Sequence, residues 1–153
     1  RWREAPTDLP CKTQEFEVRK RLLFVCTGNT CRSPMAEALA EAQGLAAESA
    51  GVSAQVGDHA APNAVRALRD ARGLSLRDHA PRDVADVDLA TVDRVVAMSP
   101  AVAHQLQAEH DVESGTLVTW AISDPYGGSL ADYRWCLEQI AAALDDLVSP
   151  DQT

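Results

Sequence analysis

Apolar positions along the chain alternate between short runs and longer stretches with helical spacing. Four short runs are predicted to be strands of a parallel sheet, and these are Leu22–Val25, Glu48–Gly51, Arg94–Met98 and Thr116–Trp120. Four helices are predicted between and after them, over Pro34–Gln43, Pro62–Arg72, a stretch beginning at Ser99-Pro100, and about Ser129–Val148. This alternation predicts a single three-layer α/β domain, in which a four-stranded parallel sheet carries helices on both faces.

Individual residues place the helix ends. Pro34 is predicted at the first position of its helix and Gly44 at its end, because proline is tolerated where a helix begins and glycine commonly ends one. Ser99 before Pro100 is typical of an N-cap followed by the first helical residue. The large side chains that we expect in the core are Met98, Trp120 and Trp135.

The length of 153 residues fits one domain. Residues 1–20 contain two prolines and no apolar periodicity, so we expect a loosely ordered extension there and the domain itself over residues 21–150. No apolar run approaches the length of a membrane span, and no signal-peptide pattern opens the chain. We therefore expect no membrane partner.

Charge and cysteine content narrow the classes of partner. The net charge of −9 disfavours nucleic acids and anionic membrane surfaces, which an acidic protein repels. Four cysteines are too few for a disulfide-rich framework of this length, so a reducing, cytoplasmic location is predicted. Cysteines and histidines lack the spacing of a zinc site, and we expect neither a metal nor another cofactor.

The segment between the first strand and the first helix carries the candidate chemistry. Arg32 follows Cys26 by six positions, and a loop between strand and helix turns its N–H groups and the positive end of the helix dipole toward one concave spot. A thiolate at Cys26 would lie in that field, within reach of a phosphate held by the same N–H groups and by the Arg32 guanidinium. The predicted phosphate-binding loop comprises Cys26, Thr27, Gly28, Asn29, Thr30, Cys31, Arg32 and Ser33.

A second segment follows the last predicted strand. Thiolate attack on phosphorus expels a poor leaving group, so the reaction needs a proton donor, which can later accept a proton from the attacking water. Asp124, followed by the rigid Pro125, is the candidate for this role. The alternative is ordinary turn chemistry, since Asp-Pro and Gly-Gly pairs are common in turns.

Two motifs together resemble the low-molecular-weight protein tyrosine phosphatase family. They are Cys26-Thr-Gly-Asn-Thr-Cys-Arg-Ser-Pro-Met-Ala-Glu and Asp124-Pro-Tyr-Gly-Gly, and the likeness extends over most of residues 21–148 in element order. The resemblance implies that Cys26 is the nucleophile, Arg32 the phosphate clamp and Asp124 the general acid and then base. No cofactor is implied, and the partner would be a phosphorylated protein.

The resemblance also implies a support for the loop. Ser33 is expected to donate a hydrogen bond that stabilises the Cys26 thiolate. Asn29 is expected to hold a left-handed conformation, supported by Ser49 in Glu-Ser-Ala-Gly and by His79 in Leu-Arg-Asp-His-Ala-Pro-Arg.

Two residues bear on the substrate. Many family members have a bulky aliphatic residue where this chain has Thr30, and threonine adds a hydroxyl that can accept a hydrogen bond from a guanidinium. The protein arginine phosphatase branch resembles this chain there and at Asp124–Ser129, so phosphoarginine is our first expectation and phosphotyrosine the alternative. Residues 52–56 contain no aromatic residue, which leaves Tyr126 as the expected aromatic at the mouth of the site.

Cys31 has two interpretations: a thiol that traps an oxidised Cys26 as a reversible disulfide, or a packed core residue. Two rival functions also stay open. An arsenate reductase would need two further cysteines, which the resemblance places around Met98–Gln105, where this chain has none. A phosphate-binding module without catalysis would have no use for Cys26.

Overall fold

The computed structural model describes residues 20–149, so most of the predicted N-terminal extension lies outside the described residues. In this part of the chain one sheet has four parallel strands in the order β2-β1-β3-β4. The strands are β1 (Arg21–Cys26), β2 (Ala46–Gly51), β3 (Arg94–Ala97) and β4 (Leu117–Thr119). The predicted four-stranded parallel sheet is confirmed.

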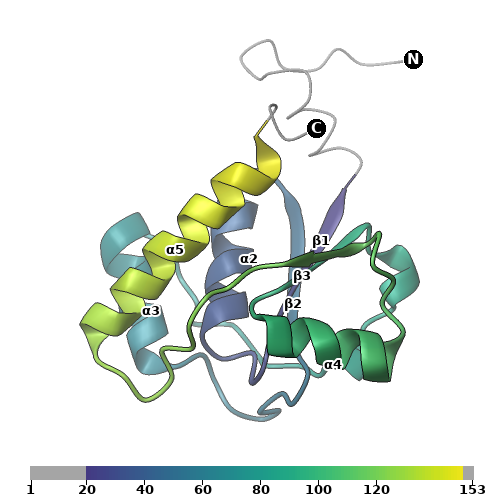
Figure 1. The fold of residues 1–153 in the computed structure, drawn as a ribbon. Coiled ribbons are helices and arrows are strands. Elements are labelled where there is room, and N and C mark those ends of the chain that lie inside the picture. The colour runs from purple at the N-terminus through teal and green to yellow at the C-terminus, as the bar shows by residue number, and fades with distance from the viewer. Residues whose placement is uncertain (1–19, 150–153) are drawn as a thin grey trace.

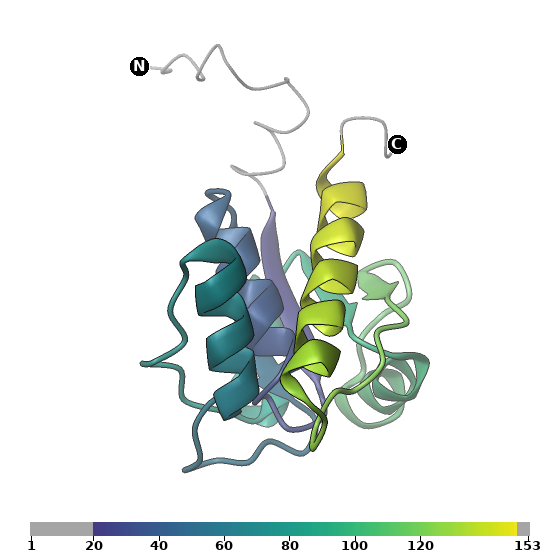
Figure 2. The same cartoon turned by 90° about the vertical axis from the view of Figure 1, so that its left-hand side faces the viewer.

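Helices cover both faces of this sheet, as predicted (Figure 1). The α-helices are α2 (Arg32–Ala42), α3 (Pro62–Arg72), α4 (Pro100–His110) and α5 (Leu130–Val148), and two short 3-10 helices are η1 (Val84–Asp86) and η2 (Leu89–Thr91). Helices α2, α3 and α5 lie together on one side (Figure 2), while α4 lies on the other. The result is a three-layer α/β domain.

Alternate residues of β1 build the two halves of the core. Leu22 and Phe24 belong to the apolar cluster shared with α2, α3 and α5, whereas Leu23 and Val25 belong to the cluster that includes Leu106 of α4. All four β1 residues are almost completely buried. A central strand that is apolar on both faces is what a parallel sheet between two helical layers requires.

Two sequence predictions about helical residues need correction. Helix α2 begins at Arg32, so Pro34 is its third residue and not its first; the N–H groups of a first turn lack helical partners, so a proline is tolerated there. Trp135 is 67% exposed and does not belong to the core, unlike Met98 and Trp120. The predicted N-cap is present, since Ser99 Oγ accepts a hydrogen bond from Val102 N at 3.3 Å.

The strand order fixes where a ligand site can form. The chain passes from β1 to β2 on one side and later places β3 on the other side of β1, so the order reverses at β1. In open α/β sheets ligands bind beyond the carboxyl ends of the strands at such a reversal. The segment after Cys26 lies at this point, and the segment after β4 leaves the same edge of the sheet.

Gly51 at the end of β2 allows the loop after β1 to pass close to β2. A Cβ atom at this position would lie 2.5 Å from the carbonyl oxygen of Thr27, closer than atoms can approach. Glycine therefore permits β2 to pass directly behind the loop that follows β1.

Candidate active site

The backbone of residues 26–30 turns its carbonyl groups away from the centre of the loop. Four of these carbonyls accept backbone hydrogen bonds from residues outside the loop: Cys26 O from Val52 N, Thr27 O from Ser53 N, Gly28 O from Gln55 N, and Thr30 O from Ala61 N, at 2.8–3.1 Å. The fifth, Asn29 O, accepts from His79 Nε2 at 2.7 Å. Because the C=O and the following N–H of a trans peptide point in opposite directions, the N–H groups of residues 27–31 turn inward. They form an anion-binding cradle at the start of α2.

Cys26 lies at the end of β1 with its sulfur enclosed by this cradle. Its side chain is almost fully buried. The Sγ atom accepts a hydrogen bond from Asn29 N at 3.3 Å and lies 3.0 Å from Ser33 Oγ. The sulfur therefore lies inside the loop, in contact with the Asn29 N–H and the Ser33 hydroxyl.

Asn29 is the centre of the support behind the loop. Its φ of 59° is the left-handed conformation that the resemblance implies. Its amide nitrogen donates to Ser33 Oγ at 2.8 Å and to Ser49 Oγ at 3.0 Å, and its amide oxygen accepts from the backbone N–H of Arg82 at 2.9 Å. His79 Nε2 donates to the backbone carbonyl of Asn29, so the side-chain amide and the main-chain carbonyl of this buried residue all have hydrogen-bond partners. These bonds hold the strained backbone in place.

Two charged side chains extend this support. Ser49 Oγ donates to the Glu37 carboxylate at 2.5 Å. The Arg82 side chain donates through Nε to Ser49 O at 3.2 Å and forms a close ion pair with Glu48, which also pairs with Arg21 at 2.6 Å. The Arg82 guanidinium, followed by the smaller effect of Arg21, holds the pKa of Glu48 below its ordinary value.

Arg32 reaches across the sheet edge toward the segment that follows β4. Its Nη1 donates to Ile122 O at 2.9 Å, and its Nη2 lies 3.7 Å from Asp124 Oδ2. The Nε atom is buried and has no hydrogen-bond partner among the described residues. A buried guanidinium N–H without a partner is costly, and an oxyanion in the cradle would satisfy it.

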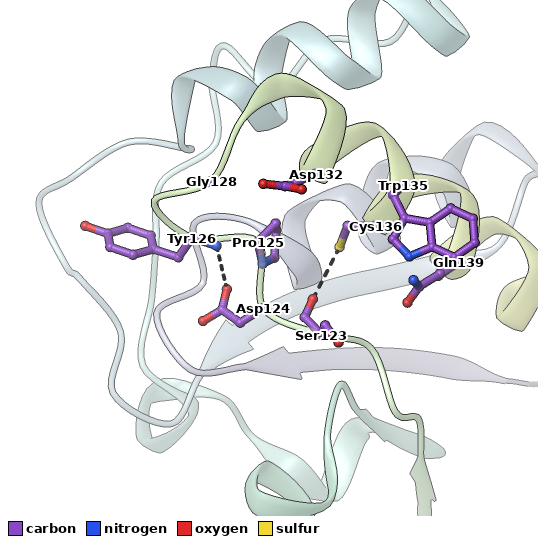
Figure 3. Close-up of a pocket in the computed structure, with 9 residues that line it drawn as sticks. All are labelled: Ser123, Asp124, Pro125, Tyr126, Gly128, Asp132, Trp135, Cys136 and Gln139. Atoms are coloured by element: carbon purple, nitrogen blue, oxygen red, sulfur yellow. Dashed lines mark hydrogen bonds between the residues drawn. The ribbon is translucent and has the colours of Figure 1, made fainter.

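Asp124 and Tyr126 lie on the opposite wall and are much more open. The Asp124 side chain is 49% exposed, and its Oδ1 accepts the backbone N–H of Tyr126 at 3.1 Å. Tyr126 is 63% exposed, and its ring points away from the other residues that line the pocket (Figure 3). Both residues border a pocket of about 200 Å³ that continues along α5 to Trp135 and Gln139 (Figure 3).

Thr30 and Cys31 form the buried end of the loop. The Thr30 hydroxyl lies 3.6 Å from Cys31 Sγ, which lies 3.4 Å from Tyr133 Oη on α5. Burial raises the pKa of the Cys31 thiol and, to about 12, that of Cys136 nearby. These two thiols therefore stay protonated near neutral pH.

The structure brings the predicted catalytic and supporting residues into one site. Sequence reasoning did not assign a role to Glu37 or Arg82, and it placed Trp135 in the core. Glu37 ends the motif that begins at Cys26, and Arg82 ends the segment Leu-Arg-Asp-His-Ala-Pro-Arg that contains His79, so both lie in segments that the family resemblance covers. Among residues 20–149, no group of three or more histidine, cysteine or acidic residues is arranged to hold a metal ion.

The site combines a thiol in a cradle of backbone amides, a buried arginine and a carboxylate beside that arginine, an arrangement suited to an oxyanion next to a thiol. The family model described as low molecular weight phosphotyrosine protein phosphatase matches residues 21–152. The chain belongs to this family and is an enzyme of it.

Three comparisons illustrate the range of its relatives. A protein-arginine-phosphatase of Geobacillus stearothermophilus is 34% identical over 146 residues, which cover 87% of this chain and 97% of the relative. The crystal structure of a low molecular weight protein tyrosine phosphatase from T. tengcongensis has a TM-score of 0.78 and 34% identity, covering 84% of this chain and 97% of the other. An arsenate reductase of Staphylococcus aureus is 28% identical, covering 86% and 98%.

Proposed function

We propose that this enzyme hydrolyses phosphorylated protein side chains through a phospho-cysteine intermediate. The Cys26 thiolate attacks phosphorus while the bond from phosphorus to the side-chain oxygen or nitrogen breaks, and Asp124 gives its proton to that leaving atom. Water then attacks the phospho-cysteine, Asp124 accepts a proton from the water, and phosphate leaves as the Cys26 thiolate returns. Arg32 and the inward N–H groups bind the phosphoryl oxygens throughout.

The observation that carries this proposal is that Arg32 joins the two motif segments. Arg32 follows the loop that begins at Cys26, and its Nη2 lies 3.7 Å from the Asp124 carboxylate. A phosphoryl group bound by the cradle and by Arg32 would therefore lie close to both Cys26 and Asp124. The unpartnered Nε of Arg32 supports the same site, because it is a buried donor that a phosphoryl oxygen can satisfy.

Turnover of p-nitrophenyl phosphate tests the mechanism. Cys26→Ser is expected to lower kcat by at least about 10³-fold, because a hydroxyl in this cradle is a much weaker nucleophile than a thiolate. Cys136→Ser is the matched control, since Cys136 is equally buried but donates only to Ser123 O, at 3.8 Å. A Cys26→Ser enzyme as fast as the wild type would overturn the proposal and favour a binding module without a nucleophile.

For the substrate we propose protein phosphoarginine, with phosphotyrosine as the alternative. Thr30 supports this choice: its hydroxyl lies 3.6 Å from Cys31 Sγ, and an oxygen that donates there can still accept from a guanidinium. A relative named protein-arginine-phosphatase matches nearly its whole length to this chain. The segment over residues 52–56 provides no aromatic wall for a phenol ring, which disfavours phosphotyrosine.

Two variants of Thr30 separate the size of its side chain from its hydroxyl. The wild type is expected to cleave phosphoarginine peptides faster than phosphotyrosine peptides, and Thr30→Ile is expected to reverse that order. Thr30→Val keeps the shape without the hydroxyl, so it is expected to lose the phosphoarginine advantage while gaining little on phosphotyrosine. Equal ratios of the two rates in all three proteins would show that Thr30 does not select the substrate.

We further propose that Cys31 protects Cys26 from irreversible oxidation. A sulfenic acid formed on Cys26 by peroxide would condense with the Cys31 thiol, releasing water and forming a disulfide that a thiol reductant reopens. Both cysteines lie on one loop, five positions apart, and both are buried free thiols. Recovery of activity by dithiothreitol after peroxide is expected for the wild type and lost in Cys31→Ser. Equal recovery would overturn this role.

Partners and location follow from the same features. The proposed partner is a phosphorylated protein and not a nucleic acid, because the chain carries a net charge of −9. A cytoplasmic location is supported by three described cysteines that are all free thiols. In the part of the chain that the structure describes, no helix is long and apolar enough to span a bilayer. An arsenate reductase role has less support, because no cysteine lies in residues 98–105.

A further inference from the structure

The pocket beside Asp124 has a composition that the hydrolytic steps do not use. It lies between the loop after β4 and the first turns of α5 (Figure 3), and it includes Trp135, Gln139 and Asp132 in addition to Asp124 and Tyr126. Asp124 belongs both to this pocket and to the site around Arg32, so the two are adjacent.

Exposed aromatic surface is concentrated here. The described part of the chain exposes three large hydrophobic residues, Val56, Tyr126 and Trp135, and two of the three line this pocket. Trp135 lies at one end of the pocket and Tyr126 at the other, with Pro125 and Cys136 between them (Figure 3). Exposed indole surface beside an active site is available to stack on a ligand.

The charge of the pocket selects the kind of ligand. Of the nine residues that line it, two are aspartates and none is basic. Asp132 Oδ2 accepts the backbone N–H of Ser129 in a capping box, which offsets the positive end of α5. Among residues 20–149, no basic side chain forms an ion pair with Asp132. The nearest basic side chain on α5, Arg134, pairs with Asp70 at 3.6 Å. A tryptophan face next to carboxylates is complementary to a cationic side chain.

We propose that this pocket is a subsite for a lysine or arginine side chain of the substrate protein, close in sequence to the phosphorylated residue. The proposal rests on the proposed phosphatase function and deepens it, because it adds a sequence preference to the chemistry. Trp135 contacts the cation through its ring face, and Asp132 supplies the opposite charge, since Asp124 faces Arg32 and carries the proton for the leaving atom. Trp135 is then a specificity-determining residue that takes no part in bond cleavage.

A set of short neutral peptides tests the subsite. Each peptide holds one phosphorylated residue and a single lysine at one of the three positions on either side, and a matched peptide has norleucine in place of that lysine. At one or two positions kcat/KM for the lysine peptide is expected to exceed that for the norleucine peptide by about three- to tenfold. The gain is expected to come from a lower KM for the lysine peptide. It is expected to shrink in 0.5 M salt, because salt screens an exposed charge.

Two variants locate the preference. Trp135→Ala is expected to remove most of the lysine gain while leaving turnover of p-nitrophenyl phosphate unchanged, because that substrate has no neighbouring residue. Asp132→Asn keeps an oxygen for the cap and is expected to reduce the gain in part. Val56→Ala is the control, since Val56 is equally exposed but does not line the pocket.

The outcomes separate this proposal from the proposed function. An enzyme that turns over p-nitrophenyl phosphate but prefers norleucine or shows no preference at all six positions overturns the subsite alone. A lysine gain that survives in Trp135→Ala also overturns it. A wild-type protein with no activity on any of these phosphates overturns both the hydrolytic function and the subsite. Affinities of the same peptides for Cys26→Ser, measured by calorimetry, provide a readout without turnover.

Discussion

The two walls of the active site differ in how firmly they are held. On the wall formed by the loop after β1, Asn29 is fully buried and forms hydrogen bonds with five residues: Cys26, Ser33, Ser49, His79 and Arg82. On the facing wall, the Asp124 side chain is 49% exposed and accepts one hydrogen bond, from the adjacent Tyr126 backbone. One wall is a buried polar network, and the other is a surface turn.

This difference matches the demands of the two chemical tasks that we propose for the walls, phosphate binding by the loop and proton transfer by Asp124. A phosphoryl group is the same in every substrate, so its cradle gains from a fixed geometry in which donors need no rearrangement. The group that leaves differs between substrates, and the proton donor must follow it. A carboxyl group on an exposed turn can change its position with the leaving group, because few contacts with the rest of the fold hold it. We therefore expect substitutions in the first wall to lower both the free energy of unfolding and the catalytic rate. Substitutions in the second wall are expected to lower the rate alone.

The largest expected effect is on the exposed wall. Asp124→Asn removes the proton donor, so kcat on phenyl phosphate is expected to fall by about 10² to 10⁴-fold, with a smaller loss on p-nitrophenyl phosphate, whose leaving group needs less protonation. The fall of kcat at high pH is expected to flatten. The free energy of unfolding is expected to change by less than about 0.5 kcal/mol, because the Asp124 side chain is half exposed. Equal losses on both esters, or an unchanged pH profile, would remove Asp124 from the role of acid.

A smaller loss of activity, now joined to a loss of stability, is expected on the buried wall. Asn29→Ala leaves the Arg82 N–H without a partner and removes one hydrogen bond each from Ser33 and Ser49, so the free energy of unfolding is expected to drop by about 2–4 kcal/mol. Misplacement of the cradle is expected to lower kcat/KM by about 10²-fold.

Asn29→Gly is the matched variant, because it relieves the strain of a φ of 59° while losing the same side-chain hydrogen bonds. It is expected to lose less stability than Asn29→Ala but the same activity. Denaturant unfolding and steady-state kinetics measure the two quantities. An Asn29→Ala protein as stable as the wild type would show that substitutions in the two walls do not differ in their effect on stability.

The smallest effect concerns the ion pair behind the buried wall. Because Arg82 lowers the pKa of Glu48 from its ordinary value of 4.5, the Glu48 carboxylate stabilises the fold above that value, and this contribution disappears as the pH falls through the lower, folded-state pKa. Glu48→Gln is expected to cost about 1 kcal/mol at pH 7, and the difference from the wild type is expected to shrink as the pH falls below 4.5.

Urea unfolding across this pH range measures the difference. A double-mutant cycle with Arg82→Ala isolates the energy of the pair from other consequences of each substitution. A constant difference at every pH would show that Glu48 acts through packing and not through its charge.

Much of the site was predictable because its main parts are local. Cys26, Asn29, Arg32 and Ser33 lie within eight consecutive residues, and the strand before them and the helix after them leave the loop little choice of direction. The exposure of Trp135 also had a signal in the sequence. At 100° per residue it lies about 200° around α5 from Tyr133, which faces the core.

Other parts depended on contacts that no local pattern specifies. The backbone N–H of Arg82 meets Asn29 from 53 positions away, and the carbonyl of Ile122 meets Arg32 from 90 positions away. The motif quoted around His79 contained Arg82, but its partners followed only from the packing of that segment behind β2.

The sequence by itself determined the alternation of strands and helices and the order of chemical groups in the loop, because periodicity and loop chemistry act between neighbours along the chain. Only the tertiary structure decided that Arg32 faces Asp124 and that one wall is buried while the other is exposed. Both follow from the strand order β2-β1-β3-β4, which brings the ends of β1 and β4 to one edge, and from the close passage of β2 behind the loop.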